Sequence, residues 1–266
     1  MKELKHEASS VVDELTLFDD DLMSRVFDNN IEATELVLRI ILRREIKVIS
    51  AEGQDELKNH EVGGRNITLD VHAIDVDGKE IDIEVQSNAE GANIKRARFH
   101  SSMVDSRMLK EGQSFKELKD SYVIFMYKHD KFKKGLPLYH VERYVSETEE
   151  MFEDGSHIIY VNGNYKGTDD IGKLISDFHQ EKPENMYYDE LAQGVKHFKL
   201  VKGGHKQMSE KVERFAREYA KEYAVNEMAN CVSNLMKNMK CTLDQALHAM
   251  GIQGEEEKQI KEILQK

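Results

Sequence analysis

The sequence predicts an α/β fold in which helices pack on a central sheet and a helical segment follows at the C-terminal end. Short runs with the apolar content or the alternation of β-strands occur at 46–51, 67–75, 79–86, 122–127, 138–145 and 157–161. Apolar residues at helical spacing precede the first run, recur between the third and fourth, and dominate from about residue 189. This order is typical of an α/β core followed by a helical module. We therefore expect a core domain over 1–188 and a helical C-terminal module over 189–266.

The individual elements have local causes. Asp19-Asp20-Asp21 offers N-cap chemistry for a first helix, and Asn29-Asn30 precedes a second. Between the alternating runs 67–75 and 79–86, Asp77-Gly78 predicts a two-residue type I′ hairpin, because glycine tolerates the positive φ that this turn needs. Residues 88–112 suit a basic amphipathic helix.

The charge distribution limits the classes of function. The net charge of −12 argues against a protein that coats nucleic acid, because such affinity comes mainly from Lys and Arg that neutralise phosphates. The basic residues are nevertheless clustered: residues 92–110 carry five of them and one acidic residue, and 195–240 carry ten against five. This asymmetry permits a phosphate-binding face on an acidic protein.

Compartment and thiol chemistry follow from what the sequence lacks. No apolar run of a secretory signal follows Met1-Lys2-Glu3, and no stretch approaches the roughly 18 apolar residues of a membrane span. We expect a cytoplasmic protein that makes no contact with membranes. Cys231 and Cys241 are then expected to be reduced thiols, and without paired histidines nearby they make a poor zinc site.

The hairpin over 67–86 carries the residues with the clearest chemistry. Side chains two apart on a strand share a face, so Asp70 and Glu84 can lie together on the sheet. Two carboxylates placed together are unfavourable unless a cation neutralises them, and Mg²⁺ prefers one or two such ligands, with the Val85 carbonyl a further candidate. Alternating charges are, however, more often the wet face of an antiparallel sheet. Because Glu80 and Asp82 share that face, spacing alone does not select the ligands.

A family resemblance selects among them. The runs Ile67–Ala73 and Ile81–Gln86 with the turn between them resemble the core of the PD-(D/E)xK nuclease superfamily. The chain is more closely similar to the bacterial PD-(D/E)xK nuclease family transposases, or recombination-promoting nucleases, over roughly Leu17 to Gln193. Further segments that resemble this family span 91–102, 122–126, 135–140 and 155–163. The resemblance implies a restriction-endonuclease-like core with a central mixed sheet, and metal-dependent hydrolysis of DNA phosphodiester bonds.

The resemblance also implies site residues. Asp70 and Glu84 take the two metal-ligand positions, for Mg²⁺ or Mn²⁺, and Gln86 stands where the superfamily pattern has Lys. Neutral Gln can only hydrogen-bond, but a nearby cation could replace the missing charge, and Arg96 is the candidate. A surface arginine on a basic helix face is an equally common interpretation of Arg96. Many superfamily members use an extra acidic ligand. Glu32 or Glu35 could supply it here, although ordinary helix-surface acids are the more common case.

DNA and a second copy of the chain are the expected partners. Lys95, Arg96, Arg98 and His100 are predicted to contact DNA. A dimer is expected by analogy with nucleases that cut both strands. The C-terminal helices have the shape of a helix-turn-helix, but Glu255-Glu256-Glu257 would bring carboxylates to phosphates, which favours packing or self-association. The alternative function is a weak or inactive member that binds nucleic acid or a partner, its site eroded at Gln86.

Overall fold

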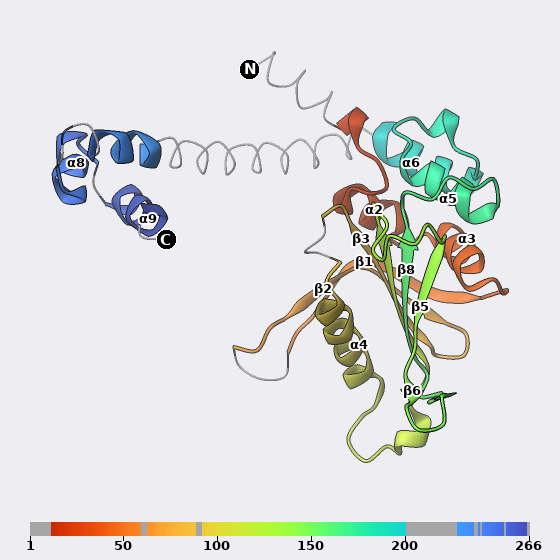
Figure 1. The fold of residues 1–266 in the computed structure, drawn as a ribbon. Coiled ribbons are helices and arrows are strands. Elements are labelled where there is room, and N and C mark those ends of the chain that lie inside the picture. The colour runs from red at the N-terminus through yellow and green to blue at the C-terminus, as the bar shows by residue number, and fades with distance from the viewer. Residues whose placement is uncertain are drawn as a thin grey trace. The chain divides into compact units, whose positions relative to one another are not determined.

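The structure is a computed structural model of the chain, shown in Figure 1. It describes residues 12–59, 63–88, 92–200, 228–236, 239, 241–252 and 254–264. The described residues up to 200 belong to one compact unit, and those from 228 onward belong to a second. Among the described helices, none combines the length and the apolar character that crossing a bilayer requires.

A mixed six-stranded sheet forms the centre of the first unit, in the order β1-β2-β3-β4-β8-β5. Its strands span Val48–Leu57 (β1), Ile67–Asp75 (β2), Glu80–Gln86 (β3), Ser121–Tyr127 (β4), Leu138–Val141 (β5) and Ser156–Asn162 (β8). Strands β1, β2 and β3 are antiparallel neighbours, β3, β4 and β8 are parallel, and β5 is antiparallel to β8. The predicted α/β core with a mixed sheet and flanking helices is confirmed.

Helices cover this sheet (Figure 1). They span Asp20–Phe27 (α2), Ile31–Leu42 (α3), Ile94–Met108 (α4), Asp170–Phe178 (α5) and Asp189–Leu200 (α6). Helix α4 packs on β3, β4 and β8. Helices α2 and α3 pack on β1, and in turn α5 packs against α3, and α6 packs against both of these helices. Two short 3₁₀ helices cover Phe115–Glu117 (η1) and Pro183–Asn185 (η2).

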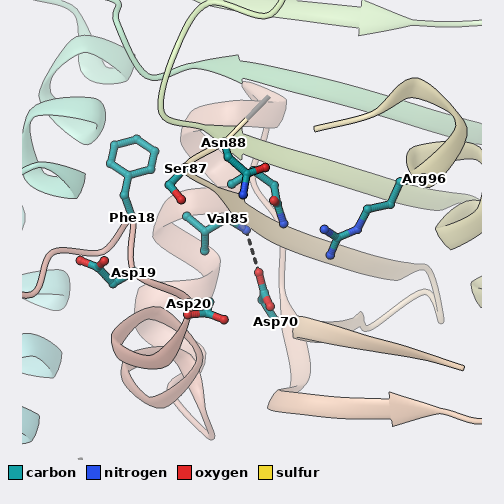
Figure 2. A pocket seen from close by; sticks show the side chains of 9 residues that line it. Phe18, Asp19, Asp20, Asp70, Val85, Ser87, Asn88 and Arg96 are labelled. Carbon is teal, nitrogen blue, oxygen red and sulfur yellow. Dashed lines mark hydrogen bonds between the residues drawn. The ribbon is translucent and has the colours of Figure 1, made fainter. Parts of the chain in front are cut away.

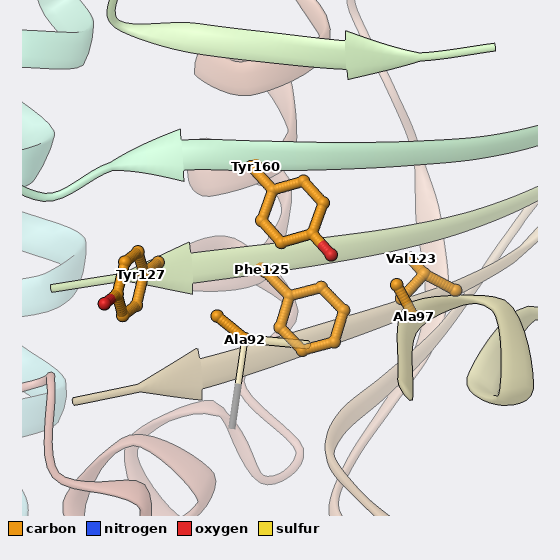
Figure 3. Close-up of a cluster of buried hydrophobic side chains, with 6 residues drawn as sticks. All are labelled: Ala92, Ala97, Val123, Phe125, Tyr127 and Tyr160. Carbon is orange, nitrogen blue, oxygen red and sulfur yellow. The ribbon is translucent and has the colours of Figure 1, made fainter. Parts of the chain in front are cut away.

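A cluster of buried side chains holds α4 against the sheet (Figure 3). The rings of Phe125 on β4 and Tyr160 on β8 stack with centroids 5.3 Å apart, and Ala97 of α4 belongs to the same buried cluster. Because parallel strands in register share their faces, the polar residues of β3 beside Val123 and Phe125 also lie under α4.

Two local expectations are wrong. The hairpin between β2 and β3 is a three-residue loop and not a two-residue type I′ turn: Asp75 faces Lys79 through a backbone hydrogen bond, and of the loop residues only Gly78 has positive φ. The expected strand 138–145 divides into β5 and β6 (Tyr144–Val145), and β6 pairs with β7 (Glu150–Met151) in a small separate sheet. The alternative of a solvent-exposed polar face does not hold for Asp82 and Glu84, which are fully buried.

Helix α6 (Asp189–Leu200) begins directly after the predicted domain boundary. The boundary predicted at 188 assigns α6 to the C-terminal module, yet α6 packs against α2, α3 and η2 in the first unit. Lys199 of α6 is buried and donates hydrogen bonds to the carbonyls of Asp13, Leu15 and Glu181, at 2.6–2.8 Å. The bonds to Asp13 and Leu15 join α6 to the segment that leads into α2, and the bond to Glu181 joins it to the segment after α5.

The second unit is a small helical cluster. Helices span Leu243–Ala249 (α8) and Glu255–Leu264 (α9), and the described part of 228–239 is helical. Thr242 caps α8 in a capping box with Gln245. A buried apolar set joins the pieces: Ala229, Val232, Ala246, Leu247, Ile252 and Ile260. The sequence also predicts an irregular break around 202–204 and a long helix from about 207 to 240. The break and most of this helix lie outside the described residues.

Candidate metal centre

Strands β2 and β3 bring Asp70 and Glu84 together. The register pairs Val71 with Ile83, and its continuation by one residue sets Asp70 opposite Glu84. The Asp70 carboxylate accepts a hydrogen bond from the Val85 N–H at 2.9 Å, and the Glu84 carboxylate accepts one from the Asp70 N–H at 3.1 Å. Each carboxylate is therefore fixed by backbone from the neighbouring strand.

Burial gives these acids unusual electrostatics. Asp70 is 8% exposed, and Asp82 and Glu84 are not exposed at all. Burial, and next the neighbouring carboxylates, raise the pKa of Asp70, Asp82 and Glu84 to about 8 each. A divalent cation beside these carboxylates would stabilise their ionised forms, because its charge offsets both the burial and the mutual repulsion that raise their pKa values. The group therefore favours the binding of a cation.

Helix α4 supplies two nitrogen-bearing side chains to the same acids. The Arg96 guanidinium donates to Glu84 Oε2 at 2.5 Å, and its Nε donates to His100 Nε2 at 3.2 Å. On the other side of its ring, His100 Nδ1 lies 2.8 Å from Asp82 Oδ2. Burial lowers the pKa of His100, which favours the neutral imidazole. Because Nε2 accepts from Arg96, the proton of a neutral ring lies on Nδ1, which faces Asp82. Arg96 and His100 thus link Glu84 to Asp82.

A cavity of about 340 Å³ opens beside these residues (Figure 2). Asp70, Val85 and Gln86 line it from the strands, and Arg96 lines it from α4. Its other lining residues are Phe18, Asp19, Asp20, Ser87 and Asn88. A substrate that enters here meets both the Asp70 carboxylate of β2 and the Arg96 side chain of α4.

Asp20 is the residue that the sequence argument missed. The Asp19–Asp21 run predicts N-cap chemistry, but the Asp19 side chain makes no cap hydrogen bond and accepts from the Thr16 N–H at 2.8 Å. Asp20, in the first turn of α2, lines the cavity and is one of the charges that raise the Asp70 pKa. The available signal was a run of three acids where one N-cap suffices.

The other predicted site residues lie elsewhere. Glu32 is exposed, and the Glu35 carboxylate binds the Val48 N–H at 2.9 Å and Lys47 Nζ at 3.3 Å. Neither of them lines the cavity.

The residues predicted to contact DNA differ in exposure. Lys95 and Arg98 are exposed on α4, in keeping with a role in DNA contact. His100 is 2% exposed, so the structure places it to hold Arg96 and Asp82 and not to touch DNA directly.

A second arrangement of donors lies deeper. Ligand atoms of Asp82, Glu84 and His100 come within 4.8 Å of one another, as the donors of a metal site do. All three residues are buried. Glu84 does not line the cavity itself but lies directly beside Asp70, which does, whereas Asp82 and His100 lie behind Glu84 on the side away from Asp70's cavity contact. The His100 nitrogens are already engaged by Asp82 and Arg96. The group is therefore better suited to support Glu84 and Arg96 through hydrogen bonds than to hold an ion that must meet substrate.

Comparison with known proteins gives one match. The model of a family described as PD-(D/E)XK nuclease family transposase matches residues 28–166. The matched segment runs from the end of α2 to the loop before α5, so it contains β2, β3 and α4. The resemblance seen in the sequence is confirmed. Neither a curated protein nor a solved structure matches the chain significantly.

Proposed function

Because the chain belongs to the PD-(D/E)XK nuclease family transposases, we propose that it is a metal-dependent DNA endonuclease that hydrolyses phosphodiester bonds. The observation that carries this proposal is the Asp70–Glu84 pair, fixed by reciprocal backbone hydrogen bonds, with Asp70 facing a cavity that is open to substrate. The family implies DNA as the substrate.

The donor set fits Mg²⁺ or Mn²⁺. These ions prefer oxygen ligands, and the residues that would hold one are Asp70 and Glu84, with the Val85 carbonyl and Asp20 as further oxygen donors. When bound, such an ion supplies Lewis acidity toward a phosphate and lowers the pKa of water. The chain itself contributes the orientation of the two carboxylates, through the backbone N–H groups of Val85 and Asp70.

Gln86 and Arg96 divide the role that Lys has in the superfamily pattern. Gln86 lines the cavity and can orient a water molecule or a phosphate through its amide. Arg96 lines the same cavity and carries the positive charge that Gln86 lacks, while its contact with Glu84 anchors the guanidinium. The alternative, a nucleic-acid-binding protein with an eroded site, is favoured only by the neutral Gln86.

The direct test is cleavage of supercoiled plasmid by purified protein with Mg²⁺, with Mn²⁺ and with chelator. We expect metal-dependent nicking or linearisation by the wild type, and none by an Asp70→Ala/Glu84→Ala double variant. Equal nicking by both proteins would refute the proposal, since a contaminant would then explain the products. Salt-sensitive DNA binding without any metal-dependent product would favour the alternative.

Asp20 gives a prediction of its own. Asp20→Asn removes one negative charge from the cavity but keeps the size of the side chain, so we expect the Mg²⁺ concentration at half-maximal cleavage to increase about tenfold or more. Loss of a group that lies just outside the direct ligands of a metal typically costs about 10–100-fold in metal affinity or activity. A metal titration of cleavage measures this. Asp21→Asn is the matched control, because Asp21 neighbours Asp20 on α2 and does not line the cavity; equal effects of both substitutions would contradict the role of Asp20.

A further inference from the structure

The three parallel strands end at one edge of the sheet, beside the candidate metal centre. Their register aligns Gln86 of β3 with Tyr127 of β4 and Tyr127 with Asn162 of β8. The Lys128 N–H then donates to the Gln86 carbonyl at 2.8 Å, and the Gly163 N–H donates to the Tyr127 carbonyl at 2.8 Å. The segments that follow β4 and β8 are therefore direct neighbours of the Gln86 backbone.

A second cavity, of about 470 Å³, lies next along this edge. It is lined by residues 165–168 after β8, by α5 with the two residues that follow it, and by Tyr187. Its charged or titratable nitrogen groups belong to Lys166, Lys173 and His179, and no Asp or Glu is among the described residues that line it. In a chain with a net charge of −12, such a lining is a local concentration of positive charge.

The neighbouring carboxylates compensate part of this charge and leave Lys166 outside an ion pair among the described residues. Asp169 accepts from the Gly172 N–H at 2.9 Å and from the Tyr165 hydroxyl at 3.3 Å, so it serves as the cap of α5. Asp170 pairs with Lys173 at 3.6 Å. Lys128 and Lys166 form no ion pair with a carboxylate in the part of the chain that the structure describes. Burial lowers the pKa of His179, which disfavours its charged form. Its Nε2 lies 2.9 Å from the Gly163 carbonyl, and the Gly163 N–H bonds to Tyr127, the neighbour of Lys128.

The two cavities are neighbours. Phe18 lines the first and His179 lines the second, and their rings pack with centroids 4.6 Å apart. Two strand spacings separate β3 from β8, roughly 10 Å in all.

We propose that the second cavity and Lys128 bind backbone phosphates of DNA next to the candidate metal centre. This inference rests on the proposed function for the choice of DNA as the ligand. Lysine at such a position neutralises phosphate without reading sequence. The contact would fix the register of the strand across the first cavity.

The test measures the affinity of full-length protein for a duplex oligonucleotide in chelator, so that no cleavage occurs, over a range of salt concentrations. The variants are Lys166→Gln, Lys128→Gln and the double substitution. We expect each single substitution to weaken binding severalfold and to lower the slope of log affinity against log salt by about 1, and the double substitution to lower it by about 2. Equal melting temperatures verify that the variants fold.

Lys116→Gln is the matched control. Lys116 is exposed on η1, which precedes β4, whereas Lys128 follows β4, so the seven residues of the strand separate them by roughly 23 Å. An unchanged affinity and slope in the double variant, or an equal change in the control, would overturn the inference. If wild-type protein binds DNA through Lys166 but never cleaves it, the proposed nuclease function fails and this inference stands. If cleavage is metal-dependent and the lysine variants bind normally, only this inference fails.

Discussion

Asp70→Asn is expected to reduce metal-dependent cleavage by about 10³-fold or more, whereas Asp82→Asn is expected to stay within about tenfold of the wild type. The first substitution removes a negative ligand that faces the cavity. Metal-assisted stabilisation of charge contributes several kcal/mol, and about 1.4 kcal/mol corresponds to a tenfold change in rate.

The two aspartates make a matched pair. Both lie on the polar face of the hairpin, both are buried, and burial raises the pKa of each to about 8. They differ in access, because Asp82 does not line the cavity. The Asp82 Oδ2 atom is hydrogen-bonded to His100 Nδ1, and the side-chain carbonyl oxygen of Asn can keep this bond. Single-turnover cleavage at saturating metal measures both variants. An Asp82→Asn protein that folds normally and is as inactive as Asp70→Asn would move the metal to the Asp82–Glu84–His100 group.

The stabilisation of the protein by Mg²⁺ is expected to increase steeply from about pH 5.5 to pH 8.5. Carboxyl groups whose folded pKa is raised stabilise the fold fully below their unfolded pKa, near 4, and that contribution is lost as the pH rises through about 8. The metal-free protein therefore loses stability over this range. Metal binding needs the ionised carboxylates, so it has to displace protons at low pH and meets less competition at high pH.

Thermal melts with chelator or with Mg²⁺ across this pH range measure the effect. At a metal concentration one hundred times the dissociation constant, binding contributes about 2.7 kcal/mol, which corresponds to an increase of roughly 5–10 °C in melting temperature at the alkaline end. The Asp70→Asn/Glu84→Gln protein should show a flatter pH profile in chelator and no increase with metal. A metal-induced increase that is largest at pH 5.5, or that persists in the double variant, would contradict the raised pKa values as its cause.

Local patterns were sufficient to predict the strands that carry the site. Alternation placed β2 at 67–75, as observed, and placed β3 within one residue of its start. The period of two also put Asp70 and Glu84 on one face, and their reciprocal backbone hydrogen bonds now show that they are neighbours. The turn was predicted less well, because Asp-Gly is compatible with both two-residue and three-residue loops.

Long-range packing determines what the sequence could not show. Whether alternating carboxylates face water or a helix depends on α4, which begins eight residues after β3 ends and covers Asp82 with His100. Asp20 reaches the cavity only because α2 packs against β2 and β3. Lys166 and Lys128 become neighbours of one site through the parallel pairing of β4 with β8, a pairing that no short motif encodes.

The expected strand 138–145 illustrates the same limit. Apolar residues resume at Tyr144 and Val145 after the charged pair Glu142-Arg143, but the chain leaves the sheet after Val141. There the Glu142 carboxylate contacts His157 of β8 at 3.0 Å, and Arg143 forms an ion pair with Asp154. Side-chain contacts thus replace the backbone ladder where propensity alone predicts that the strand continues.

The central claim is that a divalent cation binds at the cavity-facing side of the Asp70–Glu84 pair. Anomalous diffraction from crystals of the protein soaked in Mn²⁺ tests it most directly. The account predicts one strong peak within about 2.0–2.4 Å of carboxylate oxygens of Asp70 and Glu84, on the side that Asp20 and Val85 line. A peak between Asp82 and His100, or full occupancy by Mn²⁺ elsewhere with none beside Asp70, would contradict it.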